Sequence, residues 1–160
     1  GTINTSDENE KQNIAALTSA EMLVAKRIST LFKTFRFKDS VTDKGENART
    51  HSGIIAQDVK AAFEAEGLTA ANYGLWCSDT WWEHDVDVAA IEADDTADLP
   101  IEAVEAYTRT DAYETEDEAP SGSTKKTRLG IRYPELLSFL AAYNEQRFAA
   151  IETRLTALEG

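Results

Sequence analysis

The feature that most constrains this chain is a run of regularly spaced apolar residues near its end, between Glu135 and Glu159. The run steps alternately by four and three residues, which predicts a long helix with a heptad seam. One member, Asn144, is polar, and such a residue can fix register or strand number at some cost in stability. Self-association is the favoured interpretation, and packing of a single amphipathic helix on its own domain is the alternative. The seam consists of Leu137, Ala141, Asn144, Phe148, Ile151, Leu155 and Leu158.

A shorter helix and a strand are predicted near the start of the chain. Thr18 and Glu21 have the spacing of a capping box, which predicts a helix that begins at residue 15 or 18 and runs to residue 34. The alternation of apolar and polar residues over 35–38 predicts a strand. Residues 42–47 have the composition of a turn or loop.

The middle of the chain is predicted to contain further strands and one more helix. Residues 50–57 indicate a short strand that leads into a helix over 58–66, which Gly67 ends. Gly53 is predicted to let another backbone approach closely. The aromatic-rich residues 73–82 indicate a strand.

Residues 125–133 predict a last strand, and Pro134 suits the first turn of the C-terminal helix. The predicted fold is therefore α+β. It comprises an N-terminal helix, small β elements with a long hairpin arm, and a long C-terminal helix.

The charge of the chain is concentrated in one segment. The net charge is −13 over 160 residues, and residues 83–118 contain fourteen acidic residues and one basic residue, Arg109. The rest of the chain is balanced, which argues against nucleic-acid binding because phosphate neutralisation needs clustered Lys and Arg. Alternation within the segment predicts an acidic hairpin inserted in the domain, with its tip near 94–100.

Several classes of protein and site are not expected. The acidic segment lacks the spacing of a calcium loop, so neither a metal nor another cofactor is predicted. No apolar run approaches the roughly 18 residues of a membrane helix, and there is no signal-peptide pattern. The single cysteine, Cys77, cannot form an intrachain disulfide.

Near the start of the chain, Ser6 is followed five residues later by Lys11. A serine close to an amine base can be a nucleophile, provided that the amine has lost its proton, which burial or a neighbouring cation favours. The alternative is that Ser6 and Asp7 are flexible leader or helix-capping residues. The pair alone does not decide between these interpretations.

Three blocks of sequence together resemble the endosialidase-type intramolecular chaperone domain found at the C-terminus of bacteriophage tailspikes and tail fibres. The first block, Ser6–Ile14, is similar to the Ser-Asp-x-x-x-Lys-x-Asn-Ile pattern of that family. The second combines Phe35–Phe37 with Gly53–Val59 and is similar to its Gly-Phe-Ile-Ala-Gln-Glu-Val block. The third, Leu129–Leu137, is similar to its Val-x-Tyr-x-x-Leu block before the final helix.

The departures from these patterns are mild: Asp58 replaces the commoner Glu, and Pro134 replaces a commoner Asp. The resemblance implies a helical-bundle or coiled-coil homotrimer that aligns three chains so that the upstream fibre or tailspike domain of the same chain can fold. The domain then releases itself by cleavage. Residues 1–6 would be the end of the upstream fibre with the release site, and 7–160 the chaperone domain, with the acidic hairpin at 83–118.

The resemblance also implies where this happens and with which partners. Assembly and cleavage would occur in the host cytoplasm during virion assembly, and the released domain would leave the mature fibre. No nucleic-acid or membrane partner is implied.

For the cleavage chemistry, the resemblance implies that Ser6 is the nucleophile and Lys11 the base. His51 could orient or assist them, with a hydrogen-bonded strand histidine as the equal alternative. By analogy the cut lies at Ser6-Asp7. However, attack of the Ser6 hydroxyl on its own carbonyl needs a four-membered ring, whereas attack on the Thr5 carbonyl gives a five-membered ring. Attack on the chain of another subunit is the third possibility.

A competing interpretation is a non-enzymatic trimerisation or receptor-binding tip module of a fibre. Its aromatic side chains, Trp76, Trp81 and Trp82, could stack on sugars, although tryptophans in strand-rich segments are more often part of a core. A general hydrolase is not supported, because no nucleophile elbow or metal motif is found.

Overall fold

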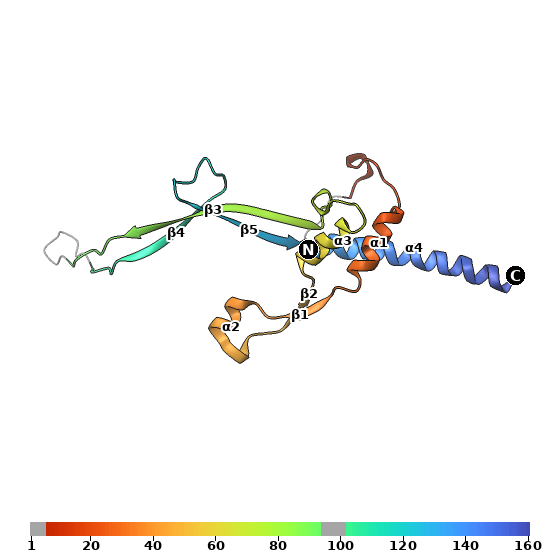
Figure 1. The fold of residues 1–160 in the computed structure, drawn as a ribbon, viewed down its shortest axis with the longest axis horizontal. Helices are drawn as coiled ribbons and strands as arrows, with labels where there is room; N and C mark the ends of the chain where they lie inside the picture. The colour runs from red at the N-terminus through yellow and green to blue at the C-terminus, as the bar shows by residue number, and fades with distance from the viewer. Residues whose placement is uncertain (1–5, 94–101) are drawn as a thin grey trace. The chain divides into compact units, whose positions relative to one another are not determined.

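The computed structural model of the chain describes residues 6–93 and 102–160. The chain divides into two compact units, one formed by the segments before Ser78 and after Gly130, and the other by Ser78–Gly130. Figure 1 labels the helices and strands of both units.

The first unit is mainly helical, with one small sheet. Strands β1 and β2 pair antiparallel, with Lys33 opposite Gly53 and Phe35 opposite His51. Two longer helices and a long C-terminal helix surround the core. The elements are η1 (Glu8–Glu10), α1 (Ser19–Ile28), β1 (Lys33–Phe35), α2 (Lys38–Lys44), η2 (Gly45–Asn47), β2 (His51–Gly53), α3 (Ala56–Glu64), η3 (Ala70–Asn72) and α4 (Tyr133–Glu159).

The core of this unit lies where α1, α3 and the first half of α4 meet. Its largest side chains are completely buried, and the rings of Tyr73 and Phe139 pack against Phe63. Burial of these apolar side chains is the main favourable term in folding of the unit. The completely buried side chains are Phe63, Ile28, Leu136, Val24 and Val59.

The start of α1 was predicted correctly, but its end was not. The capping box is present, because the Thr18 hydroxyl accepts from the Glu21 amide and the Glu21 carboxylate accepts from the Thr18 amide. The helix ends at Ile28 instead of residue 34, since the following residues form a turn in which Thr30 N–H and its hydroxyl bond to the Arg27 carbonyl.

Because α1 ends early, the neighbouring predictions shift as well. The strand predicted over 35–38 is β1, two residues earlier, where it can pair with β2. The predicted loop over 42–47 contains the end of α2 and the short helix η2 instead. Local composition did not reveal these short helical turns.

Two glycines account for the local geometry around α3. Gly67 has φ +71°, and the amides of Gly67 and Leu68 bond to the carbonyls of Glu64 and Phe63, which is a Schellman motif. The prediction that Gly67 ends this helix is therefore confirmed. At Gly53, by contrast, a side chain approaches rather than another backbone: a Cβ there would collide with the hydroxyl of Tyr133, which accepts from the Ile54 amide.

The predicted C-terminal helix is confirmed as α4, which begins two residues earlier than expected and has Pro134 in its first turn. Proline suits this position because its missing N–H would have no partner there. Among the residues that the structure describes, no helix is both long and apolar enough to cross a membrane.

A three-stranded sheet of order β4-β3-β5 makes up most of the second unit. Its strands are β3 (Trp76–Val88), β4 (Tyr107–Tyr113) and β5 (Thr124–Ile131). Strands β3 and β4 pair antiparallel from Trp82 opposite Tyr113 to Val88 opposite Tyr107, which confirms the hairpin pairing predicted for the acidic segment. The predicted hairpin tip near 94–100 lies outside the described residues.

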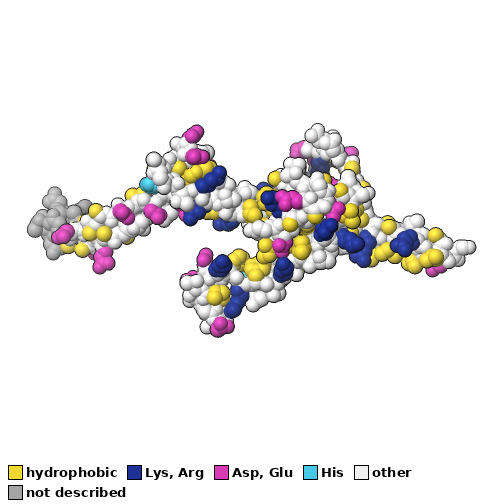
Figure 2. All heavy atoms as spheres, viewed as in Figure 1, with side chains coloured by type: hydrophobic (Ala, Val, Ile, Leu, Met, Phe, Trp, Pro, Cys, Tyr) yellow, Lys and Arg dark blue, Asp and Glu magenta, His cyan; other side chains and the backbone are white. Residues whose placement is uncertain are grey.

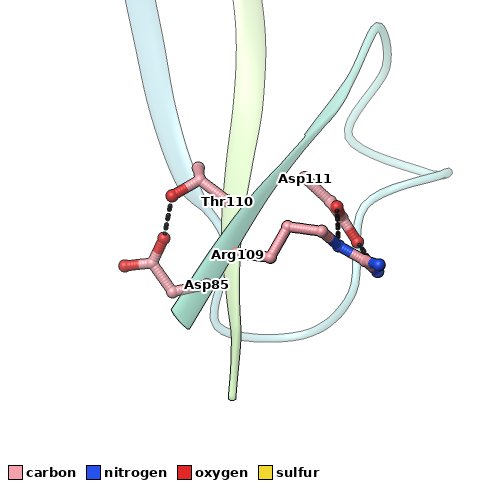
Figure 3. A network of polar contacts seen from close by, with 4 residues as sticks. All are labelled: Asp85, Arg109, Thr110 and Asp111. Carbon is pink, nitrogen blue, oxygen red and sulfur yellow. Dashed lines mark hydrogen bonds and ion pairs between the residues drawn. The ribbon is translucent and has the colours of Figure 1, made fainter. Parts of the chain in front are cut away.

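The β3–β4 ribbon has two chemically different faces, because side chains alternate along each strand. On one face the Asp85 carboxylate accepts from the Thr110 hydroxyl at 2.6 Å. On the other, Arg109 donates to Asp111 at 2.7 Å, and Figure 3 shows the two pairs on opposite sides of the ribbon. The salt bridge raises the pKa of Arg109, chiefly through the hydrogen bond to Asp111. These pairs are exposed and fix side-chain positions more than they stabilise the fold.

Candidate cleavage site and assembly surface

A short turn at the start of the described chain brings Ser6 and Lys11 together. The Asp7 carboxylate accepts from the backbone and side-chain nitrogens of Asn9, both at 2.9 Å, and so caps η1. The Lys11 amide then bonds to the Glu8 carbonyl at 3.1 Å. The hydrogen bonds from Asn9, first from its backbone, lower the pKa of Asp7.

At this turn the Lys11 Nζ donates to the Ser6 Oγ at 2.8 Å. The two side chains are therefore within the distance at which a base can take the proton of a nucleophile. Both residues are exposed in the single chain. The structure thus places the predicted serine and lysine together, while the capping role considered for this segment belongs to Asp7.

Ser6 and Lys11 lie on an open cleft of about 1170 Å³ in the first unit. Apart from this pair, the lining is largely apolar and includes residues from α4 and from the segment before β3. One cation, Arg132, also lines the cleft, and its guanidinium donates to the Gly74 carbonyl at 2.8 Å. The lining also includes Leu17, Tyr73, Glu135, Phe139 and Ala142.

Tyr73 links this cleft to the cap of α1. Its hydroxyl donates to the Glu21 carboxylate at 2.9 Å, and the same carboxylate receives hydrogen bonds from Thr18. Burial, together with the hydrogen bond and charge of Glu21, raises the pKa of Tyr73 to about 12. Burial opposes ionisation of Glu21, but its hydrogen bonds from Thr18 and Tyr73 outweigh that effect and lower its pKa.

The structure does not bring His51 into this cleft. His51 lies on β2, where its ring packs against Phe35 and Phe37 with centroid distances of 6.1 and 5.0 Å. It is not among the described residues that line the cleft with Ser6 and Lys11. In the single chain its contacts are those of an aromatic packing residue.

Sequence reasoning did not identify Tyr73 or Arg132 as residues of this site. The sequence places Tyr73 at the start of a predicted strand, and Arg132 in the predicted last strand and in the block before the last helix. Both reach the cleft through tertiary contacts with segments more than 50 residues away. No local pattern indicates such contacts.

The apolar seam predicted along α4 lies on the surface of the single chain. The exposed fractions of Leu137, Phe148 and Leu158 are 55%, 61% and 83%. Leu136 and Tyr143, on a different side of the same helix, are buried in the core. Figure 2 shows hydrophobic side chains exposed along the C-terminal part of α4. The seam is therefore free to pack against another helix.

The tryptophans proposed as sugar platforms are engaged within the chain. The Trp76 indole N–H donates to the Ala56 carbonyl at 3.0 Å. Lys125 and Arg128 each lie 5.3 Å from the ring centroids of Trp82 and Trp81. A cation over each ring occupies one face on which a sugar could stack. Among the described residues, no group of three or more His, Cys, Asp and Glu side chains is arranged to hold a metal ion.

Comparison with known families gives one match in this region of the chain. Residues 6–68 match the peptidase S74 family model, which is described as chaperone of endosialidase. The matched segment contains the Ser6–Lys11 turn, α1, the β1–β2 pair and α3.

Similar proteins are phage tail components. A probable tail spike protein of Klebsiella phage 0507-KN2-1 is 31% identical over 154 residues, which are 93% of this chain and 11% of that protein. The tail spike protein of Escherichia virus K5 is 34% identical over 128 residues, or 79% of this chain and 16% of that protein. The chain therefore spans only a small part of the length of these relatives.

Two solved structures share the fold. The carboxy-terminal domain of the bacteriophage T5 L-shaped tail fibre with its intramolecular chaperone domain has a TM-score of 0.69 and 26% identity, covering 98% of this chain and 32% of that one. A novel intramolecular chaperone has a TM-score of 0.59 and 28% identity, covering 91% and 99%. On its sequence blocks, family match and fold, the chain belongs to the endosialidase-type intramolecular chaperone domains of phage tail spikes and tail fibres.

Proposed function

We propose that this chain is a self-releasing chaperone. It trimerises, templates the folding of an upstream tail fibre or tailspike domain of the same chain, and then cuts itself off beside Ser6. Residues 1–6 are the end of the upstream fibre in this account, and 7–160 are the chaperone. Assembly and cutting take place in the host cytoplasm during virion assembly.

The observation that carries the cleavage is the 2.8 Å contact between the Lys11 Nζ and the Ser6 Oγ. Ser6 acts as the nucleophile, and Lys11, once neutral, takes the proton of its hydroxyl. The membership of the chain in a peptidase family supports this assignment. Each chain is cut once, because the reaction removes the enzyme from its own substrate.

The chemistry can follow one of two routes. In the intramolecular route, the Ser6 Oγ attacks the Thr5 carbonyl through a five-membered ring, and Lys11 passes the hydroxyl proton to the departing Ser6 nitrogen. Water then hydrolyses the resulting ester and separates Thr5 from Ser6. In the other route, the Ser6 Oγ of one subunit attacks a carbonyl in the chain of another, and the hydroxyl proton passes through Lys11 to the departing nitrogen. Water then hydrolyses the resulting ester. This route also permits a cut at Ser6-Asp7.

Assembly is expected to control this reaction. Ser6 and Lys11 are exposed in the single chain, so a neighbouring subunit can reach both groups. Packing of neighbouring subunits would bring the chain of one subunit close to the Ser6 of another, as the second route requires. The exposed seam on α4 supports such packing, since a heptad seam of seven residues suits a helical bundle.

In this proposal His51 takes no part in the reaction within one chain. Its ring packs on Phe35 and Phe37, and His51 is not among the described residues that line the cleft. A role for His51 would require that it acts on the site of another subunit. Substitution of His51 by Phe tests this: cutting at the wild-type rate assigns His51 to packing, and a loss of cutting in a correctly assembled trimer assigns it to the reaction.

The experiment for the proposed cut uses the whole chain behind a small soluble tag and measures fragment masses after expression. The wild type is expected to give a boundary beside Ser6, and the two candidate bonds give fragments that differ by the mass of one serine residue. Ser6→Ala and Lys11→Ala are expected to remain whole. Lys11→Arg keeps the positive charge but cannot serve as a base, so it should also remain whole.

Lys26→Ala is the matched control, because Lys26 is an exposed lysine on α1 that does not line the cleft. It should cut like the wild type. Full cutting of Ser6→Ala or Lys11→Ala would overturn the assignment of the pair. A trimer that stays whole in every variant would leave a non-enzymatic trimerisation or receptor-binding module as the better description.

A further inference from the structure

The residues between Lys11 and α1 are nearly all exposed, so apolar burial does not explain what holds the candidate cleavage turn in place. From residue 6 to residue 16 every side chain is exposed. Asn13, within this segment, has φ +57°, a left-handed conformation that fixes a bend but makes no tertiary contact by itself. Some other feature must attach the segment to the folded unit.

That attachment is provided by one side chain of α4. The Leu17 amide donates to the Gln146 Oε1 at 3.0 Å, and the Gln146 Nε2 donates to the Leu17 carbonyl at 3.2 Å. Both groups of one backbone residue are thus held by a single amide, in the way that a paired strand would hold them. The two residues are 129 positions apart and half-buried, where a hydrogen bond is stronger than in open water.

The position of this clamp is suited to the cleft. Leu17 itself lines the cleft with Ser6 and Lys11, and the next residue, Thr18, caps α1. The chain therefore leaves the cleft and enters α1 directly at the point that Gln146 holds. A shift of Leu17 would move the whole segment that carries the candidate nucleophile and base.

Gln146 also continues the row of α4 residues that forms the cleft wall. Glu135, Phe139 and Ala142 line the cleft, and Gln146 follows at the same alternation of four and three residues. Each of these four residues precedes a seam residue by two positions. Positions two apart on a helix lie about 200° apart around its axis. The clamp and the seam are therefore on nearly opposite sides of α4.

We propose that Gln146 is a positioning residue for the self-cleavage. By holding the backbone of Leu17 it fixes the Ser6–Lys11 turn to the side of α4 that faces away from the assembly seam. One helix thereby carries both the assembly surface and the side chain that holds the cleavage site in position. The site stays outside the helical bundle. This inference depends on the proposed cleavage function.

The test uses three variants of the tagged chain. Gln146→Met removes both hydrogen bonds at similar volume, and Gln146→Glu keeps only the acceptor for the Leu17 amide. Thr153→Met is the matched control, because Thr153 lies one heptad further on the same side of α4. Within the described part of the chain, its hydroxyl donates only to the Ala149 carbonyl of its own helix. The half-time of self-cleavage, the trimer mass, the thermal midpoint and hydrogen exchange at the Leu17 amide are measured for each.

Gln146→Met is expected to slow cleavage by about tenfold to a hundredfold, since small displacements of reacting groups have effects of that size. Exchange at the Leu17 amide should accelerate, while trimer mass and thermal midpoint stay near those of the wild type. Gln146→Glu should recover part of the rate, which a general loss of packing would not produce. Thr153→Met should behave like the wild type.

Two outcomes overturn the inference, and they can be told apart. If the wild type cuts and Gln146→Met cuts equally fast, the positioning role is wrong while the proposed function stands. If the wild type itself is not cut, the proposed function fails and the positioning role fails with it. If Gln146→Met does not fold, Gln146→Glu provides the test. The positioning role is also wrong if this variant folds, exchanges its Leu17 amide faster than the wild type and still cuts at the wild-type rate.

Discussion

The two halves of α4 look alike in the sequence but differ in the structure. In the first half, Leu136 is buried in a core cluster with side chains of α1 and α3, and Tyr143 is buried as well. In the second half, every residue from 147 to 159 is exposed, including Phe148, Ile151 and Leu155. One helix therefore has apolar residues of two kinds, those that stabilise the single chain and those left for another chain.

The difference shows that an apolar pattern specifies burial without specifying the partner. Because the seam and the core residues lie on different sides of the helix, changes to one set can be made while the other is kept. Substitutions in the two sets should therefore have separable effects on assembly and on the stability of the single chain.

Charges placed in the exposed half should abolish assembly. The double variant Ile151→Asp with Leu155→Asp puts six carboxylates into the proposed three-helix seam, where desolvation and like-charge repulsion both oppose packing. Sedimentation should give the mass of a single chain, with a far-UV spectrum that is still helical, and self-cleavage should be lost. Thr153→Asp, on the other side of the helix, should keep the trimer, and a trimer in the double variant would contradict the seam.

Two adjacent leucines should respond in different ways to the same substitution. Leu136→Ala removes a completely buried side chain and should lower the free energy of unfolding of the chain by about 2–5 kcal/mol at any protein concentration. Leu137→Ala changes a side chain that is 55% exposed in the single chain, so it should weaken only the concentration-dependent assembly. Urea unfolding at two protein concentrations separates the effects, and equal behaviour of the two variants would remove the distinction.

Removal of the N-terminal cap of α1 should have a smaller effect on the stability of the chain. Thr18→Ala deletes the hydroxyl that accepts from the Glu21 amide, which should cost about 1 kcal/mol of stability in thermal or urea unfolding. Ser19→Ala, at the next residue, keeps this cap and should have a smaller effect. An unchanged stability of Thr18→Ala would show that the cap is redundant with the packing of α1 against α3 and α4.

The smallest effect at neutral pH is expected from Tyr73. The pKa of Tyr73 is raised from 10.0 to about 12, so the folded state favours the protonated phenol. The stability from this preference is fully present below pH 10 and is lost as the pH rises through the folded value. Between pH 10 and about pH 12, the free energy of unfolding should fall further below its value at neutral pH in the wild type than in Tyr73→Phe. If the free energies of unfolding of the two proteins change equally with pH over this range, the proposed effect of the Tyr73 pKa is wrong.

Much of the fold could be predicted from the sequence where local chemistry decides it. The capping box at Thr18, the end of α3 at Gly67 and the start of α4 near Pro134 each depend on one or two neighbouring residues. The end of α1 could not be predicted, because pairing of β1 with β2 competes with continued helix and involves residues 16 to 20 positions apart. The short helices α2 and η2 were not predicted, because their sequences have no apolar residues at regular helical spacing.

The candidate site could likewise be predicted only where neighbouring residues determine its geometry. The spacing of Ser6 and Lys11 indicated a pair, and the turn capped by Asp7 brings them together locally. The contacts of Tyr73 with Glu21, of Arg132 with Gly74 and of Gln146 with Leu17 join distant segments, and no single-sequence pattern contains that information. The place of His51 likewise depended on its aromatic neighbours in the folded unit rather than on its block of sequence.

The most direct test of the account is native mass spectrometry of the tagged wild-type chain sampled through expression and purification, because it reports assembly and cutting in the same molecules. We predict that fragments with a boundary beside Ser6 occur only within trimers, or as trimers already released from the tag. Cut single chains would contradict the dependence on assembly. Chains that remain whole in every assembly state would contradict the self-release itself.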